Sequence, residues 1–426
     1  MPFRRQHVFA GLGALVASVF MFGAVAAQSA KPVPQASVPK AKVPSAKVPD
    51  VPVPPPPEFE SSAWVLMDYG TGRVLASKNP DKRLEPASIT KIMTDYVVSA
   101  EVAAGKVHMD DDVFISENAW RKGGAGTDGS TSFLKVRSKV PLKDLMYGLI
   151  IQSGNDAAIA LAEHVAGSEA GFVTLMNAYA KRLGMNNTHY ENVSGYPAEG
   201  HHSSALDTAI LSRALIHDFP ADYKISSIKK FTWNGITQYN RNNLLWRDPT
   251  VDGIKTGHTK AAGYCLAASA IRDGQRLIAV VMGTPSSKAR VDDAQALLNY
   301  GYRFFESHKL FDAGQQLASP RLWKGSENHL PVGLDKELSL TVKRGSYDDL
   351  KASINLPSTL VAPFKKGQKV GTLTISLDDH VLVTRPVVAL ADAPEGGFFS
   401  RLWDTIMLWF HGSDDGQTTV KAEVAS

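Results

Sequence analysis

The sequence has a single cysteine, Cys265, among its 426 residues. One thiol cannot form an intramolecular disulfide, and it cannot assemble a cysteine-based zinc site or an iron–sulfur cluster within one chain. Excess charge is also small, because 46 Lys and Arg residues face 42 Asp and Glu residues, which gives a net charge of +4. This balance indicates no nucleic-acid partner. The 44% hydrophobic and 21% charged fractions exclude a collagen, a coiled coil and a polytopic membrane protein, and the length predicts more than one folded unit.

Residues 1–27 have the three parts of a secretory signal peptide. Arg4 and Arg5 form a basic start, an apolar stretch runs from Val8 to Val25, and the segment 24–27 reads Ala-Val-Ala-Ala. An uncleaved membrane anchor is the alternative, because the apolar run is nearly long enough to span a bilayer. Both interpretations predict that the rest of the chain is exported, and an exported protein with a single cysteine indicates a bacterial envelope.

Residues 28–57 are predicted to be a proline-rich linker. Ten of the 24 prolines lie between Lys31 and Pro57. Proline fixes φ and lacks the backbone N–H, so this stretch should be an extended, polyproline-like spacer. A PxxP ligand for a partner domain is the alternative interpretation.

Residues 58–315 are predicted to form one α/β or α+β domain. Runs rich in β-forming residues at 63–68 and 73–77 flank a glycine-bearing turn, and runs at 263–269 and 276–282 flank Asp273-Gly274. Each pair should therefore be a hairpin. The periodicity between the hairpins is mostly helical. We expect an antiparallel sheet that is completed by distant segments, with a helical insertion between them.

One predicted helix begins near Pro86 and stops at Gly105, with apolar residues at spacings of three and four. It places Ser88 and Lys91 on one face, a turn apart. A hydroxyl at a helix N-terminus lies among free N–H groups in positive potential, and a lysine of lowered pKa can take its proton. The spacing alone is weak evidence, since Ser-x-x-Lys occurs five times in the chain.

Two further motifs accompany this pair. Ser153-Gly154-Asn155 follows an apolar helix and precedes another, so it should lie in a tight inter-helix loop; by itself it is also typical of an ordinary capping loop. Lys255-Thr256-Gly257 occurs once and introduces the 263–269 hairpin strand, so it should lie on or beside an edge strand.

With Ser-x-x-Lys, Ser-x-Asn and Lys-Thr-Gly in this order, the sequence resembles the penicillin-binding D-alanyl-D-alanine carboxypeptidases, the low-molecular-mass group of the serine β-lactamase and penicillin-binding superfamily. The resemblance extends through 86–94, 149–156 and 251–259, and covers roughly 58–412. It implies a serine enzyme without a cofactor that removes the terminal D-Ala from peptidoglycan stem pentapeptides through an acyl-serine intermediate. It also implies inhibition by β-lactam antibiotics, which would acylate the same serine.

The resemblance assigns the catalytic roles. Ser88 would be the acylated nucleophile and Lys91 its general base. Ser153 would relay a proton to the leaving amine, and Asn155 would donate to the substrate backbone. The backbone N–H groups of Ser88 and His258 would form the oxyanion hole.

The resemblance also assigns the substrate-binding roles. Lys255 would supply positive potential near the substrate carboxylate, and Thr256 would donate a hydrogen bond to it. Gly257 would leave room for the acyl donor to lie along the strand edge. Arg241 and Arg290 are the candidate guanidinium partners of the carboxylate, with an ordinary surface arginine as the alternative for each.

Two other features receive plainer interpretations. His201 and His202 are adjacent and have no third ligand at metal spacing, so they predict a polar loop and no metal site. The glycine-rich segment 121–130 predicts a mobile loop near the site.

Residues 316–393 are predicted to form a small all-β C-terminal domain, because 338–342 and 369–377 alternate with period two between turn residues. The resemblance implies that this β-rich domain is a pedestal that holds the catalytic domain off the membrane.

Residues 394–412 are predicted to form an amphipathic membrane-anchor helix, followed by a polar tail at 413–426. Its apolar arc contains Phe399, Leu402, Trp403, Ile406, Met407, Trp409 and Phe410. The fourteen residues Phe398–His411 reach only about 21 Å, short of the ~30 Å hydrocarbon core, so this helix should lie in the inner-membrane surface. A helix packed on its own domain is the alternative.

Other functions compete with the carboxypeptidase. A β-lactamase is disfavoured, because no Glu-x-x-Leu-Asn motif follows Ser153 and such an enzyme needs neither pedestal nor anchor. A wall-binding protein with a dead site is disfavoured by the intact motifs. D,D-endopeptidase activity stays open.

Overall fold

The computed structural model describes residues 53–124, 127–411 and 417–422. The predicted signal peptide, most of the proline-rich linker and parts of the predicted polar tail lie outside these residues.

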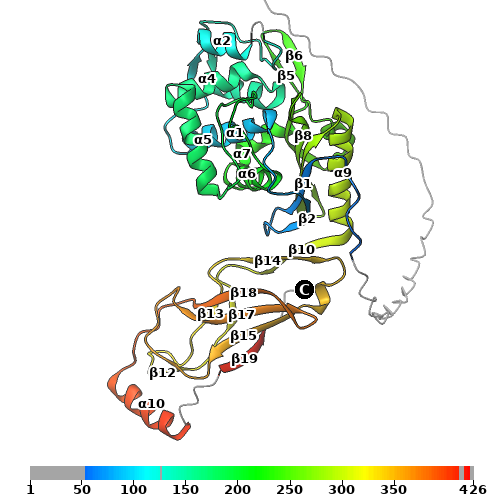
Figure 1. The fold of residues 1–426 in the computed structure, drawn as a ribbon. Coiled ribbons are helices and arrows are strands. Elements are labelled where there is room, and N and C mark those ends of the chain that lie inside the picture. Colours follow the sequence, from blue (N-terminus) through cyan, green and yellow to red (C-terminus); the bar gives the residue numbers. More distant parts are fainter. Residues whose placement is uncertain (1–52, 125–126, 412–416, 423–426) are drawn as a thin grey trace, which may run out of the picture. The chain divides into compact units, whose positions relative to one another are not determined.

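The first domain is built on a five-stranded antiparallel sheet, ordered β2-β1-β9-β8-β7. Strands β1, β2 and β8 of this sheet are labelled in Figure 1. Its strands are β1 (Ala63–Asp68), β2 (Val74–Lys78), β7 (Val251–Thr259), β8 (Gly263–Arg272) and β9 (Gln275–Thr284). Strand β1 pairs with β9, so that Ala63 lies opposite Met282. The predicted hairpins and the sheet completed by distant segments are therefore confirmed.

The insertion between β2 and β7 is mainly helical. It contains the 3₁₀ turn η1 (Ala87–Thr90), α1 (Lys91–Ala103), α2 (Glu117–Gly123), α3 (Leu142–Tyr147), the π-helical turn η2 (Gly148–Gln152), α4 (Asn155–Ala166), α5 (Glu169–Leu183), α6 (Ala205–Asp218), α7 (Pro220–Tyr223), η3 (Lys224–Ser227) and α8 (Leu244–Arg247). Two short ladders complete it, β3 (Asp112–Phe114) with β4 (Lys139–Pro141) and β5 (Lys230–Trp233) with β6 (Ile236–Tyr239).

The central sheet separates two hydrophobic cores. Strand β1 shows how the alternation works: Val65 and Met67 face the helical insertion, whereas Trp64 and Leu66 face α9 (Ser287–Phe304) on the opposite side. Because both faces are covered, β1 is buried along its whole length. This rigid sheet is the support for the residues of β7.

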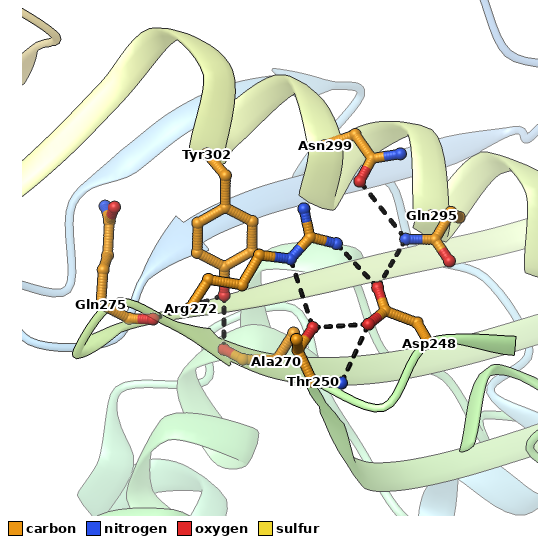
Figure 2. A network of polar contacts seen from close by, with 8 residues as sticks. All are labelled: Asp248, Thr250, Ala270, Arg272, Gln275, Gln295, Asn299 and Tyr302. Atoms are coloured by element: carbon orange, nitrogen blue, oxygen red, sulfur yellow. Dashed lines mark hydrogen bonds and ion pairs between the residues drawn. The ribbon is translucent and has the colours of Figure 1, made fainter. Parts of the chain in front are cut away.

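A polar network ties α9 to the segment that precedes β7 (Figure 2). Arg272 Nη2 donates to Asp248 Oδ2 at 2.7 Å, and Gln295 Nε2 donates to the same oxygen at 2.8 Å. The Tyr302 hydroxyl donates to the Ala270 carbonyl at 2.6 Å, while the guanidinium of Arg272 lies over the Tyr302 ring. The network fixes the start of β7 from outside the cleft.

The second domain is all-β, as predicted. Strand β10 (Phe305–Phe311) pairs with β14 (Leu338–Lys343), and a six-stranded sheet has the order β11-β13-β18-β17-β15-β19. The remaining elements are β11 (Gln316–Ala318), β12 (Leu322–Trp323), β13 (Val332–Gly333), η4 (Tyr347–Asp349), β15 (Lys351–Pro357), β16 (Leu360–Val361), β17 (Lys369–Leu377) and β18 (His380–Ala389). Alternate residues of β15, including Ile354 and Leu356, are buried in a core of this domain's own.

The C-terminal region forms helix α10 (Phe398–His411) and strand β19 (Gln417–Ala422). Strand β19 pairs antiparallel with β15, in a region for which the sequence predicted only a polar tail. Within the described ranges, no helix has both the length and the apolar character that crossing a membrane requires.

Candidate active site

Ser88 and Lys91 are aligned by a 3₁₀ turn, where the sequence predicted an α-helix from Pro86. Residues 87–90 form the turn η1, and the α-helix begins only at Lys91. A 3₁₀ helix has three residues per turn, so residues i and i+3 eclipse each other. The Lys91 ammonium accordingly donates to the Ser88 hydroxyl oxygen at 3.0 Å.

The turn is held between β7 and the loop that contains Gly195. A Cβ atom on Gly257 would lie 2.9 Å from the Pro86 carbonyl oxygen, and one on Gly195 would lie 1.8 Å from the Ala87 carbonyl oxygen. Ala87 itself has a φ of 48°, which is unusual for a residue with a side chain. Close packing on both sides stabilises this strained turn.

Lys91 is fully buried and all three of its N–H donors are used. Besides Ser88, the ammonium donates to Asn155 Oδ1 at 2.6 Å and to the Ser194 carbonyl at 2.8 Å. Burial, then the positive charge of Arg241, lowers the pKa of Lys91 to about 7, although Asp156 acts in the opposite direction. A neutral amine is therefore accessible near neutral pH, as a general base requires.

Ser153 and Lys255 form a second serine–lysine pair. Ser153 caps η2 in a left-handed conformation with a φ of 60°, just before α4 begins at Asn155. Lys255 extends from β7 and donates to Ser153 Oγ at 2.9 Å and to the Thr256 carbonyl at 3.1 Å. Both side chains are buried.

The site concentrates positive charge. Burial, followed by the charges of Lys91, Arg241 and Arg290, lowers the pKa of Lys255 well below its ordinary value. Arg241 is solvent-exposed but donates to Ser130 Oγ at 2.6 Å, and Arg290 is buried and donates to the Gly257 carbonyl at 3.1 Å. Such a field favours an anionic ligand.

A cleft of about 610 Å³ joins these groups. Of the ten residues singled out in the sequence, eight line it: Ser88, Ser153, Asn155, Arg241, Thr256, Gly257, His258 and Arg290. Lys91 and Lys255 reach it through their hydrogen bonds to Ser88 and Ser153. The His258 ring stacks on Tyr264, with 4.0 Å between ring centroids.

Sequence reasoning missed other groups at this site. The carbonyl of Ser194 and the carboxylate of Asp156 both act on Lys91. Asp156 accepts hydrogen bonds from Thr131 Oγ1 and from the N–H groups of Ser132 and Leu134. Asp156 could have been predicted from its position directly after the Ser-x-Asn motif. A backbone carbonyl such as that of Ser194 cannot be predicted in this way, because every residue has one. Among the described side chains, no group of three or more His, Cys, Asp or Glu could hold a metal ion.

Comparison with known proteins identifies the family of the chain. A family model for D-alanyl-D-alanine carboxypeptidases matches residues 50–286, more than half of the chain. The chain belongs to this carboxypeptidase family. A second model, the C-terminal domain of penicillin-binding protein 5, matches residues 305–395, so the chain is of the low-molecular-mass penicillin-binding group.

The matches to individual relatives extend over most of this chain. The D-alanyl-D-alanine carboxypeptidases DacC and DacA of Escherichia coli are 45% and 46% identical over 358 residues, which is 83% of this chain and 90% and 89% of theirs. The crystal structure of penicillin-binding protein 5 from Haemophilus influenzae is 40% identical with a TM-score of 0.76, and the match covers 80% of this chain and 99% of that chain.

Proposed function

We propose that this protein is a serine D-alanyl-D-alanine carboxypeptidase that removes the terminal D-Ala from peptidoglycan stem pentapeptides. The observation that carries the proposal is the buried Lys91 amine, 3.0 Å from the Ser88 hydroxyl at the base of a cationic cleft. Family membership supports the same reaction. The proposed catalytic domain begins at 58 and the proposed β-rich pedestal ends at 393. The boundary that the sequence placed between 315 and 316 lies instead before β10, which pairs with β14 of the second domain.

In the acylation step, neutral Lys91 takes the proton of Ser88 as its oxygen attacks the carbonyl of the penultimate D-Ala. The N–H groups of Ser88 and His258 stabilise the oxyanion. Ser153, hydrogen-bonded to Lys255, relays this proton from Lys91 to the departing D-Ala amine, so that Lys91 is neutral again, while Asn155 holds the peptide backbone. Water then attacks the acyl-Ser88 ester, with Lys91 again the base, and releases the shortened peptide acid.

The terminal carboxylate is proposed to bind at the cationic end of the cleft. The Thr256 hydroxyl donates to it, and Arg241, Arg290 and Lys255 supply positive potential. Although burial lowers the pKa of Lys255, a substrate carboxylate beside it raises this pKa, because an opposite charge favours the ammonium form. Substrate binding thus restores the charge that the role of Lys255 requires.

The direct test is to incubate the protein with a pentapeptide ending in D-Ala-D-Ala and to analyse the products by mass spectrometry. We expect free D-Ala and a tetrapeptide acid in equal amounts. Absence of both products would refute the proposal, and faster cleavage of a cross-linked peptide dimer would favour the D,D-endopeptidase.

The rate of acylation by a β-lactam should rise with pH through about 7, because the deprotonated Lys91 is the active base. Arg241 lowers the pKa of Lys91, so Arg241→Gln should move the midpoint of this rise to higher pH. The measurement is the second-order acylation rate constant between pH 5 and 9. Arg385→Gln, at an exposed position of β18, is the matched control and should leave the midpoint unchanged. An unmoved midpoint in Arg241→Gln would contradict the coupling.

We also propose that α10 anchors the exported protein at the periplasmic face of the cytoplasmic membrane. Its large apolar side chains face solvent, with Phe399 83%, Trp403 64% and Trp409 82% exposed. On the opposite side, the buried Asp404 carboxylate accepts from the Lys324 N–H at 2.6 Å and lies 3.7 Å from Arg321. The polar face thus docks on the second domain while the apolar face is left for lipid.

Replacing Phe399, Trp403 and Trp409 together by serine should weaken vesicle binding by at least ~100-fold, since each large apolar side chain contributes about 1.5–3 kcal/mol on burial. The assay is sedimentation with phosphatidylglycerol–phosphatidylethanolamine vesicles in high salt, using a chain that starts at Gln28. Turnover of a small peptide should not change, and Thr405→Ala, an exposed position on α10, is the control. Undiminished sedimentation of the triple variant would overturn the anchor.

A further inference from the structure

His201 is buried against the 3₁₀ turn that carries Ser88, although the sequence predicted a polar loop. Its side chain is 4% exposed. Its Nδ1 accepts a hydrogen bond from the Glu191 N–H at 3.0 Å, and its Nε2 lies 2.8 Å from Thr90 Oγ1. Because Nδ1 is the acceptor, the neutral ring carries its proton on Nε2 and donates to Thr90. Burial, then the nearby His202 and His189, lowers the pKa of His201 to about 4 and keeps the ring neutral.

Thr90 belongs to the segment that links the nucleophile to its base. The same loop that contains His201 contacts this segment at further points. The Ser194 carbonyl accepts from Lys91 Nζ at 2.8 Å, and the Val193 carbonyl accepts from Thr94 Oγ1 at 2.7 Å. The loop 193–201 is therefore fastened to the N-terminal end of α1 by one side chain, His201, and by two carbonyls.

We propose that His201 is a positioning residue for acylation. By holding Thr90 and the loop 193–201 together, it keeps the Ser194 carbonyl and the Ser88 hydroxyl aligned on the Lys91 amine. This inference rests on the proposed function, in which Lys91 is the base. His201 does not touch the cleft and contacts none of the groups proposed to bind the substrate carboxylate.

Loss of the ring leaves the Glu191 N–H and the Thr90 hydroxyl without these partners, and the base loses its alignment. The expected effect is on the chemical step and not on binding of the carboxylate by Lys255 and Thr256, which belong to β7. His201→Leu should therefore lower the acylation rate constant and kcat by about 5- to 10-fold, the effect of one or two lost hydrogen bonds, with KM little changed.

Four variants make the test specific. Thr90→Val removes only the hydroxyl and should lower the same rates by a similar or smaller factor, because His201→Leu also loses the Glu191 contact. The double variant should be no slower than the slower single variant, because both substitutions disrupt the His201–Thr90 contact. His201→Gln should retain most of the rate, since its amide can accept from Glu191 and donate to Thr90. His202→Gln is the matched control, because the neighbouring ring donates to the Gly200 carbonyl outside the site.

The measurements are acylation by a fluorescent penicillin, kcat and KM for the pentapeptide, and the melting temperature. Wild-type acylation rates in folded His201→Leu and Thr90→Val, or rate losses that multiply in the double variant, would overturn the inference. If His201→Leu does not fold, the acylation rate of Thr90→Val tests the inference by itself. Failure of the proposed function is distinguishable, because the wild-type protein would then release no D-Ala.

Discussion

Replacing Ser88 by alanine is expected to lower D-Ala release by at least ~1,000-fold and to abolish covalent labelling by penicillin. In the proposed mechanism the Ser88 hydroxyl attacks the carbonyl, and Lys91, whose amine lies 3.0 Å away, takes its proton. Alanine removes only one oxygen from the 3₁₀ turn, so the fold and the cleft should be retained.

The measurement is D-Ala release by mass spectrometry, together with labelling by a fluorescent penicillin. Ser227→Ala is the matched control, because Ser227 begins another Ser-x-x-Lys tetrad, is exposed and only donates to the Lys224 carbonyl. It should behave as wild type. Turnover that survives in folded Ser88→Ala would place the nucleophile elsewhere.

Lys255→Gln should lower turnover of the pentapeptide by at least ~10-fold, about 1.4 kcal/mol of transition-state stabilisation. Glutamine retains much of the bulk and can still donate to Ser153, but it removes the charge that attracts the carboxylate and favours proton transfer. Lys255→Arg keeps a positive charge in a different geometry, so its turnover should lie between that of the wild type and that of Lys255→Gln.

Comparing a free-acid pentapeptide with its C-terminal amide separates the two roles of Lys255. The wild-type enzyme should prefer the free acid, and the preference should weaken in Lys255→Gln. Equal rates for acid and amide in the wild type would show that the carboxylate is not recognised, and an endopeptidase would then be the better account.

Much of the fold was predictable because local signals agreed with the tertiary structure. Alternation and turn residues such as Asp273-Gly274 identified the hairpins that became β1–β2 and β8–β9. The three motifs identified the chemistry, and the structure brings Ser88, Ser153 and Lys255 to one cleft. The three-residue spacing of Ser88 and Lys91 places the two side chains within reach of each other in either a 3₁₀ or an α-helical turn.

The remainder depends on tertiary contacts that leave little trace in the sequence. Gly195 and Gly257 pack closely against the 3₁₀ turn at 87–90. This packing cannot be predicted from the helical periodicity of the segment. Strand β19 contributes only Val420 and Ala422 to the core, too few apolar residues to indicate a strand. The burial of His201 depends on Thr90, 111 residues away along the chain.

The site of penicillin attachment tests the central claim most directly. The β-lactam ring opens on attack without losing an atom, so one serine should gain the mass of one whole penicillin molecule. After trypsin digestion of the labelled protein, we predict that this mass is on the peptide Leu84–Lys91, in which Ser88 is the only serine. Attachment to any other peptide would contradict the assignment of Ser88 as the nucleophile.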